Sequence, residues 1–274
     1  MMQKERLATG SLKLLLVIIA LFFLFPFYWM LSSSFKEMSV AYQIPPEFFP
    51  VHPTIGNYMK LLETEAARWM LNSVGISVVT TLAVLVISSM AAYALAKIPF
   101  RGSKAIFSLL VGAMTIPTTV LLIPQFKIAV SLSLVNTYAG LIIHALASPY
   151  MIFLLRQFMM TIPRELLESA RIDGCGEAGI FFRIMLPLSK PGLGAIAIFT
   201  FVASWNDYIW QLLIIKDTSM MTLPLGVATL INVESVDWGL IMAGSVLASL
   251  PVLIVFLAFQ RYFVKGLTVG AVKG

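Results

Sequence analysis

Four polar side chains recur in an otherwise apolar stretch of the sequence, at Thr200, Ser204, Asp207 and Gln211. Their spacings of four, three and four residues would place them on one face of a helix, with Asn206 beside them. Hydroxyl, carboxylate and carboxamide groups in such a row can line a path for a polar solute. They can equally hydrogen-bond a neighbouring helix or a partner subunit, and the residues alone leave these alternatives open.

Other residue types that carry chemistry are sparse. The only cysteine is Cys175, which excludes an internal disulfide framework, and the two histidines, His52 and His144, have no metal-ligand spacing. The sequence has no Gly-x4-Gly-Lys-Ser/Thr phosphate loop, so any ATP chemistry must come from a partner. An intramembrane enzyme would need a nucleophile or a metal cluster, and neither is visible.

The composition indicates the surroundings of these side chains. Of the 274 residues, 59% are hydrophobic and only 12% are charged, whereas roughly a quarter of the residues of soluble domains are charged. Together with a mean hydropathy of +0.92, this composition excludes a soluble enzyme and an intrinsically disordered chain. We therefore expect a membrane protein.

Six apolar runs are long enough to cross roughly 30 Å of hydrocarbon. Runs of this length without strict alternation predict helices, because a main chain in lipid must satisfy its own hydrogen bonds. The predicted fold is an all-α polytopic membrane domain with helices at residues 14–31, 73–96, 105–123, 138–155, 193–215 and 240–259. Kinks are expected in the third helix, near Gly112 and Pro117, and in the fourth, near His144 and Pro149.

The distribution of Lys and Arg predicts the orientation in the membrane. Six spans put both termini on one side, and that side carries fourteen of the nineteen basic residues. Both termini are therefore expected in the cytoplasm. The first run is expected to be a retained helix, because no small-residue cleavage pattern follows it. The net charge of +6 follows from this topological bias and requires no nucleic-acid partner.

Two loops are long. The extracytoplasmic loop at residues 32–72 is rich in proline and predicts a short helix near Ile55–Glu65. The cytoplasmic loop at residues 156–192 predicts two short helices at an angle. The first ends at Gly174, because so tight a turn commonly needs a residue in the left-handed conformation. The second covers residues 176–185, with Leu186-Pro187-Leu188 as its stop. This loop is either a connector packed under its own bundle or a peg that docks into a soluble partner.

The first of these helices is amphipathic. Leu166, Leu167 and Ala170 are expected on its apolar face. On the other face, Glu168 is expected to pair with Arg164 or Arg171.

The spacing within this loop resembles that of a known family. Glu168-Ser169-Ala170, three residues, Gly174, nine residues and then Ile184-Met185-Leu186-Pro187 match the E-A-A-x3-G-x9-I-x-L-P signature of ABC importer permeases, with Ser169 in place of an alanine. Trp205-Asn206-Asp207-Tyr208 and the terminal Gln260–Gly274 segment further resemble maltose-type carbohydrate permeases.

The resemblance implies a mechanism and a set of partners. Such a permease pairs with a second permease subunit, two cytoplasmic ATP-binding subunits grip the loops of the pair, and an extracytoplasmic binding protein delivers the sugar. ATP and Mg bind to the partner subunits, and this chain carries no cofactor and no catalytic residue. Glycerol-phosphate and polyol importers share these motifs, and an ion-coupled secondary carrier is a rival that would transport without ATP.

The resemblance also implies roles for particular residues. The ATPase-coupling residues would be Glu168, Ser169, Ala170, Asp173, Gly174, Ile184, Leu186 and Pro187. The sugar path would involve the polar residues at 200, 204, 206, 207 and 211. The tail at residues 260–274, kept flexible by its glycines, would enter the ATPase interface through Gly266, Leu267, Thr268, Gly270 and Lys273.

Overall fold

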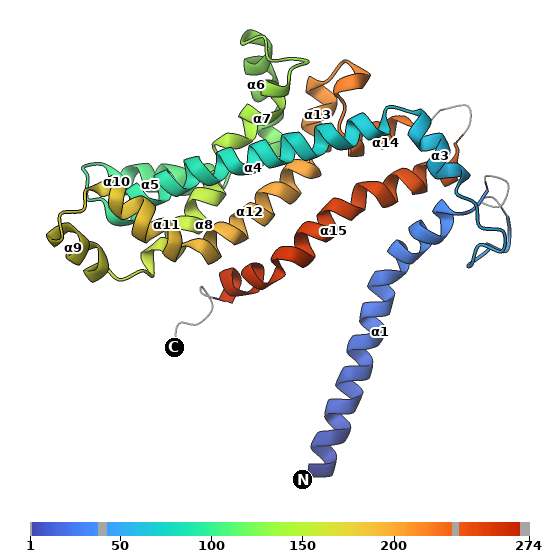
Figure 1. Cartoon of the computed structure of the whole chain (residues 1–274), viewed down its shortest axis with the longest axis horizontal. Coiled ribbons are helices and arrows are strands. Elements are labelled where there is room, and N and C mark those ends of the chain that lie inside the picture. The colour runs from blue at the N-terminus through green and yellow to red at the C-terminus, as the bar shows by residue number, and fades with distance from the viewer. Residues whose placement is uncertain (1, 38–42, 232–235, 269–274) are drawn as a thin grey trace. The chain divides into compact units, whose positions relative to one another are not determined.

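A computed structural model describes the backbone of residues 2–37, 43–231 and 236–268, and the side chains of residues 12–37, 43–231 and 236–260. Within these ranges the chain is helical and contains no strand, as predicted (Figure 1). The helices are α1 (Met2–Ser34), α3 (Gly56–Glu63), α4 (Ala66–Lys97), α5 (Ser103–Ala113), α6 (Thr118–Ser131), α7 (Tyr138–Leu146), α8 (Pro149–Met160), α9 (Glu165–Ile172), α10 (Glu177–Ile180), α11 (Leu186–Leu188), α12 (Lys190–Trp205), α13 (Tyr208–Ile214), α14 (Leu223–Thr229) and α15 (Trp238–Thr268). A π-helical turn (Phe181–Met185) and a 3₁₀ turn (Thr218–Met220) complete the set.

Three helices of the described chain are continuous and apolar over a membrane-spanning length, at Leu12–Ser34, Ala66–Lys97 and Trp238–Gln260. Three further pairs of helices reach this length only together, because each pair is bent at a short break. The described chain therefore has three unbroken spans, or up to six if each bent pair is one span. The six predicted helices are therefore not all continuous, as the kinks predicted for the third and fourth already indicated.

The breaks in the first two bent pairs lie where kinks were predicted. The pair α5 and α6 is bent by 103°, and Pro117 stands at the break as the N-cap of α6. The pair α7 and α8 is bent by 45°, and Pro149 opens α8. Proline is tolerated at these positions because the first residues of a helix lack intrahelical partners for their N–H groups.

The predicted helix at residues 193–215 is not continuous, which is a correction. It begins earlier, at Lys190, and breaks at Asn206 and Asp207 into α12 and α13. The Asn206 carboxamide donates a hydrogen bond to the Val202 carbonyl, 3.0 Å away. Asparagine and aspartate compete with the main chain for hydrogen bonds in this way and therefore favour helix ends.

The short helix predicted near residues 55–65 is confirmed as α3. The predicted flexible tail is partly wrong, because α15 continues through residues 260–268. A glycine inside a helix costs only about 1 kcal/mol relative to alanine, and Gly266 does not end this one.

The chain divides into two compact units. The first comprises Met1–Ala67 and Gly226–Ser249, and the second comprises Arg68–Leu225 and Leu250–Gly274.

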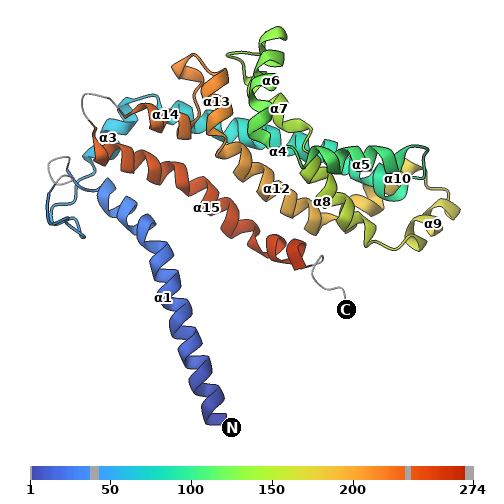
Figure 2. The same ribbon diagram turned by 180° about the vertical axis from the view of Figure 1, so that it is seen from behind.

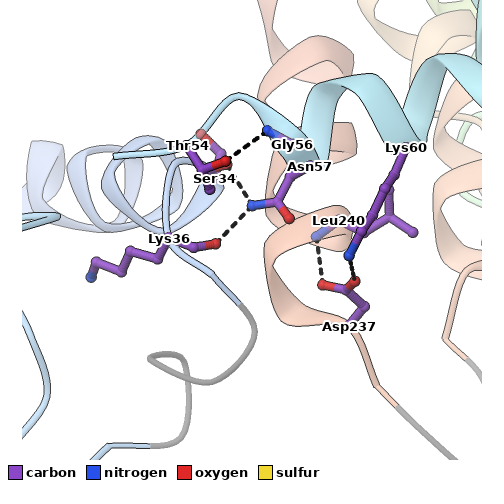
Figure 3. Close-up of polar contacts among 8 residues, drawn as sticks. All are labelled: Ser34, Lys36, Thr54, Gly56, Asn57, Lys60, Asp237 and Leu240. Carbon is purple, nitrogen blue, oxygen red and sulfur yellow. Dashed lines mark hydrogen bonds and ion pairs between the residues drawn. The ribbon is translucent and has the colours of Figure 1, made fainter. Parts of the chain in front are cut away.

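In the first unit, a buried asparagine joins three segments (Figure 3). The Asn57 carboxamide on α3 donates to the main-chain carbonyls of Ser34 and Lys36, at 2.9 and 2.8 Å, just after α1. A Cβ atom at Gly239, in the first turn of α15, would lie 2.5 Å from Asn57 Nδ2. Nearby, Lys60 Nζ pairs with Asp237 Oδ2 at 3.0 Å. Asn57 thus fixes the end of α1 and the start of α15 on α3.

The second unit has two hydrophobic clusters. One, the loop cluster, joins α4, α8, α12 and the loop at residues 156–192, which is predicted to be cytoplasmic. Leu155, Ile180, Met185 and Ile196 are fully buried in this cluster. The other joins α4, α6, α7 and α13 around Leu141, Trp210 and Ile214. Figures 1 and 2 show α6, α7 and α13 rising together on one side of α4. The breaks after α7 and after α12 therefore both fall between the two clusters.

Candidate functional site

The first helix of the cytoplasmic loop, α9, presents a buried face and an exposed face. Leu167 and Ala170 are buried in the cluster with α4 and α8, as predicted. Leu166 is 46% exposed and does not share that face, which corrects the expectation. Residues 166 and 167 point in directions about 100° apart on a helix, so the buried face of this short helix is narrower than the sequence pattern indicated.

The turn that ends α9 has the geometry of a Schellman motif. Gly174 has φ +82°, in the left-handed region, as predicted for this turn. The Gly174 N–H donates to the Arg171 carbonyl at 3.1 Å, and the Cys175 N–H donates to the Ala170 carbonyl at 2.9 Å. Cys175 packs against the same cluster that contains Ala170, which completes the hydrophobic contact of the motif.

The second helical segment of the loop runs from Glu177 to Leu188. Leu186-Pro187-Leu188 is helical, so the expectation that it stops the helix is wrong. The preceding π turn shifts the hydrogen bonding by one residue, and the Leu186 N–H bonds the Phe181 carbonyl. Pro187 follows this π turn directly within the continuous segment. Ile184 and Leu186 are partly buried against the loop cluster, and Pro187 is exposed.

A carboxylate that the sequence interpretation did not select ties this loop to α4. Glu177 Oε2 accepts a hydrogen bond from the Tyr93 hydroxyl at 2.6 Å, and Glu177 Oε1 lies 2.8 Å from Arg171 Nη2. The Arg171 partner is thus Glu177 rather than the predicted Glu168. Tyr93 is 84 positions away from Glu177 in the sequence, so no local spacing signals the contact.

Two further bonds hold the loop on α4. The Lys97 ammonium, at the end of α4, donates to the Ile162 carbonyl just before α9. Arg156 Nε on α8 donates to the Leu95 carbonyl at 3.1 Å. The inner face of the loop is therefore anchored by polar bonds as well as by apolar packing.

The outer face of the loop is open. Among the predicted coupling residues, Glu168, Ser169, Asp173 and Gly174 are exposed, and Ala170 alone is buried. The apolar side chains of Ile172 and Phe182, 87% and 64% exposed, also lie on this face. One face of the loop therefore packs under the bundle and the other is exposed, and docking of the exposed face to a partner stays a prediction.

The polar residues near position 205 do not form the single row that was predicted, because the helix breaks among them. Asp207 lies at the break, and its Oδ2 is 2.9 Å from His144 Nε2 on α7. The His144 ring packs on the Trp210 ring with centroids 4.8 Å apart, and Trp210 Nε1 donates to the Gly140 carbonyl. The Asp207 and His144 side chains are 26% and 20% exposed, so the pair is accessible from one side.

The other members of that predicted row have separate surroundings. Gln211 is buried on α13, where its side-chain oxygen accepts a hydrogen bond from the Thr222 hydroxyl. The Thr200 hydroxyl is buried and has no hydrogen-bond partner in the part of the chain that the structure describes. Ser204 is partly buried, and Asn206 is exposed. The structure thus brings together Asp207 with His144, not the five predicted residues.

Comparison with known proteins identifies the family. A family model described as the inner membrane component of binding-protein-dependent transport systems matches residues 83–269, which include the whole cytoplasmic loop. The chain belongs to this family. It is therefore a multi-pass membrane component of a transport system, and we refer to it below as the permease.

Curated relatives of the permease match over almost its entire length. It is 40% identical over 268 residues to the arabinooligosaccharides transport system permease protein AraQ of Bacillus subtilis, covering 96% of this chain and 95% of the relative. It is 34% identical over 267 residues to the sn-glycerol-3-phosphate transport system permease protein UgpE of Yersinia pestis, covering 93% and 94%. These relatives are permeases of transport systems for sugars and a sugar-related phosphate.

A solved structure shares the fold of the permease. A chain of a bacterial ABC transporter that imports the acidic polysaccharide alginate matches with a TM-score of 0.86, at 24% identity, over 95% of this chain and 98% of that one. At this identity the likeness supports the fold alone.

The residues predicted to lie at the ATPase interface in the tail are not part of a described site. Gly266, Leu267 and Thr268 belong to α15, while Gly270 and Lys273 lie outside the described residues. Among the residues searched, no group of three His, Cys, Asp or Glu side chains could hold a metal ion.

Proposed function

We propose that the permease is the membrane-spanning subunit of an ATP-driven, binding-protein-dependent importer for oligosaccharides or related sugars. The observation that carries the proposal is the 40% identity to an arabinooligosaccharides permease over nearly all of both chains. A glycerol-phosphate importer is the second candidate, on the basis of the 34% identity to UgpE. The lower identity makes it the less favoured one.

In this function the cytoplasmic loop is the contact with an ATP-binding subunit. Its exposed face carries the acidic Glu168 and Asp173 together with the apolar Ile172 and Phe182. Exposed aromatic and aliphatic side chains beside charges suit a groove on a soluble partner. Two ATP-binding subunits would hold ATP and Mg, and their closure would displace the loops of two paired permease chains.

A second permease subunit and lipid are the proposed neighbours of the first helix. The apolar window of Leu12–Ser34 has a hydropathy of 2.6 and is 0% buried within this chain. Such a helix is stable in a membrane or against another apolar surface, and not in water. The excess of basic residues on one side supports a cytoplasmic location for both termini.

Asp207 and His144 are the proposed polar contacts of the sugar path. A partly exposed carboxylate at a break between two helix segments can accept hydrogen bonds from sugar hydroxyl groups. The carboxylate is costly in lipid, about 2.5–3.5 kcal/mol at mid-depth. Its pairing with His144 and its place at a broken helix agree with a position inside the assembly.

The decisive experiment is uptake in vesicles that contain the complex purified through a tag on this chain. We expect uptake of arabinotriose to require internal ATP and an external binding protein, and to exceed uptake of sn-glycerol 3-phosphate. Uptake that is driven by an ion gradient without ATP would contradict the proposal and support a secondary carrier. Preferred uptake of sn-glycerol 3-phosphate would support the second candidate.

A further inference from the structure

Three helical segments meet at one carboxylate in the cytoplasmic loop. Glu177 is the first residue of α10, and its Oε2 accepts a hydrogen bond from the Tyr93 hydroxyl on α4. Its Oε1 lies 3.0 Å from Nε and 2.8 Å from Nη2 of Arg171 on α9. We propose that Glu177 is the positioning residue that joins the loop to α4, so that a displacement of the loop moves α4. This inference rests on the proposed function.

The packing of Tyr93 fixes the direction of its hydrogen bond to Glu177. Tyr93 is only 5% exposed, and its ring packs on Phe181 with centroids 5.4 Å apart. The ring is therefore held by packing while its hydroxyl reaches the carboxylate. Apolar contacts of the loop cluster can slide, because dispersion attraction has no preferred direction. A hydrogen bond loses its strength when its angle changes, so the Tyr93 bond resists sliding.

The ion pair between Arg171 and Glu177 stabilises the loop itself. Arg171 lies before the Gly174 turn and Glu177 lies after it, so the ion pair bridges the turn that joins α9 to α10. Without this pair, the exposed turn at residues 173–176 and apolar packing alone would hold the angle between the two helices. With it, a force on the exposed face of α9 reaches α10 and Tyr93 together.

The helix that receives the displacement is suited to carry it. α4 has 32 residues and no break, which is about 48 Å at 1.5 Å per residue. It contributes Ile76 to the cluster around Trp210 and Tyr93 to the loop cluster. By contrast, one break separates α7 from α8, and another separates α12 from α13. A bond from the loop to α4 therefore reaches across both clusters.

The test compares Glu177→Gln and Tyr93→Phe with a matched control, Glu165→Gln, in the complete complex reconstituted in vesicles. Tyr93→Phe keeps the ring packed on Phe181 and removes only the hydroxyl. Glu165 is an exposed carboxylate at the start of α9 in the same loop, with no side-chain hydrogen bond within the described residues. The measured quantities are the amount of assembled complex, ATP hydrolysis, and arabinotriose taken up per ATP hydrolysed.

We expect Glu177→Gln and Tyr93→Phe each to lower arabinotriose uptake per ATP at least threefold at an unchanged amount of complex. The double variant should be no lower than Glu177→Gln alone, since the Tyr93 bond ends on the carboxylate that this substitution already removes. Glu165→Gln should match the wild type. Unchanged uptake per ATP in both variants, including the case in which only the amount of assembled complex falls, would overturn the inference. A wild-type complex that hydrolyses ATP but takes up no arabinotriose would count against the proposed function instead.

Discussion

Replacing Gly174 by alanine separates backbone strain from steric effects at the turn of the cytoplasmic loop. Gly174 has φ +82°, and a Cβ atom built there meets no heavy atom within 4 Å. The whole cost of the substitution therefore comes from the backbone conformation. A residue with a Cβ loses roughly 1–2 kcal/mol in the left-handed region. If the turn relaxes instead, it loses its two Schellman hydrogen bonds, each worth about 0.5–1.5 kcal/mol.

Either outcome weakens the loop by a similar amount. A loss of about 1–2 kcal/mol changes the population of the native turn roughly 5- to 30-fold. We expect Gly174→Ala to lower both the copurified ATP-binding subunit and sugar-stimulated ATP hydrolysis by several fold. Gly174→Asn should lie between alanine and wild type, because asparagine tolerates the left-handed region better than other non-glycine residues.

The chain offers a matched control two residues away. Gly176 has φ −72°, and a Cβ atom there also meets no heavy atom within 4 Å. Gly176→Ala adds the same methyl group to the same loop without left-handed strain, so ATP hydrolysis should remain close to wild type. Equal ATP hydrolysis and equal copurification for the two alanine variants would refute the argument, since the backbone conformation is what distinguishes them.

Two more substitutions test other parts of the molecule. Asp207→Asn removes the charge that faces His144 at a nearly unchanged side-chain volume. We expect weaker sugar affinity in uptake assays and an unchanged amount of complex. Wild-type uptake would mean that the pair only joins helices. Asn57→Ala leaves two buried main-chain carbonyls unpaired, which should lower the free energy of unfolding by about 2–3 kcal/mol and the thermal midpoint with it. Lys60→Gln is its control, since the exposed pair with Asp237 is worth at most about 1 kcal/mol, and an equal effect of the two variants would contradict this reasoning.

Features set by local chemistry were predictable from the sequence. The all-helical membrane fold followed from long apolar runs, and the breaks near Pro117 and Pro149 followed from proline's missing N–H. The left-handed Gly174 followed from its place between two helical patterns. Each of these inferences depends on residues within a few positions of one another, and such interactions can be read from spacing.

Features set by distant partners were not predictable. Glu177 resembles any other exposed acidic residue in the sequence, and only the fold brings Tyr93 to it. Arg171 had a plausible partner at Glu168, yet the turn at Gly174 places Glu177 closer. The break at Asn206 and Asp207 was missed for a related reason. The apolar run continues through it, and hydropathy does not register that these two side chains hydrogen-bond outside the helical pattern.

The break at Asp207 also determines how two classes of variant should differ. α7 and α13 belong to one hydrophobic cluster and α8 and α12 to the other, and Asp207 and His144 meet near the breaks between these helices. A change at that pair alters the structure near the break between α12 and α13. It leaves the loop and its proposed docking face intact. Asp207→Asn should therefore change sugar uptake while the ATP-binding subunit stays bound. Gly174→Ala acts on the docking face itself and should lower binding of that subunit first, with uptake falling as a consequence.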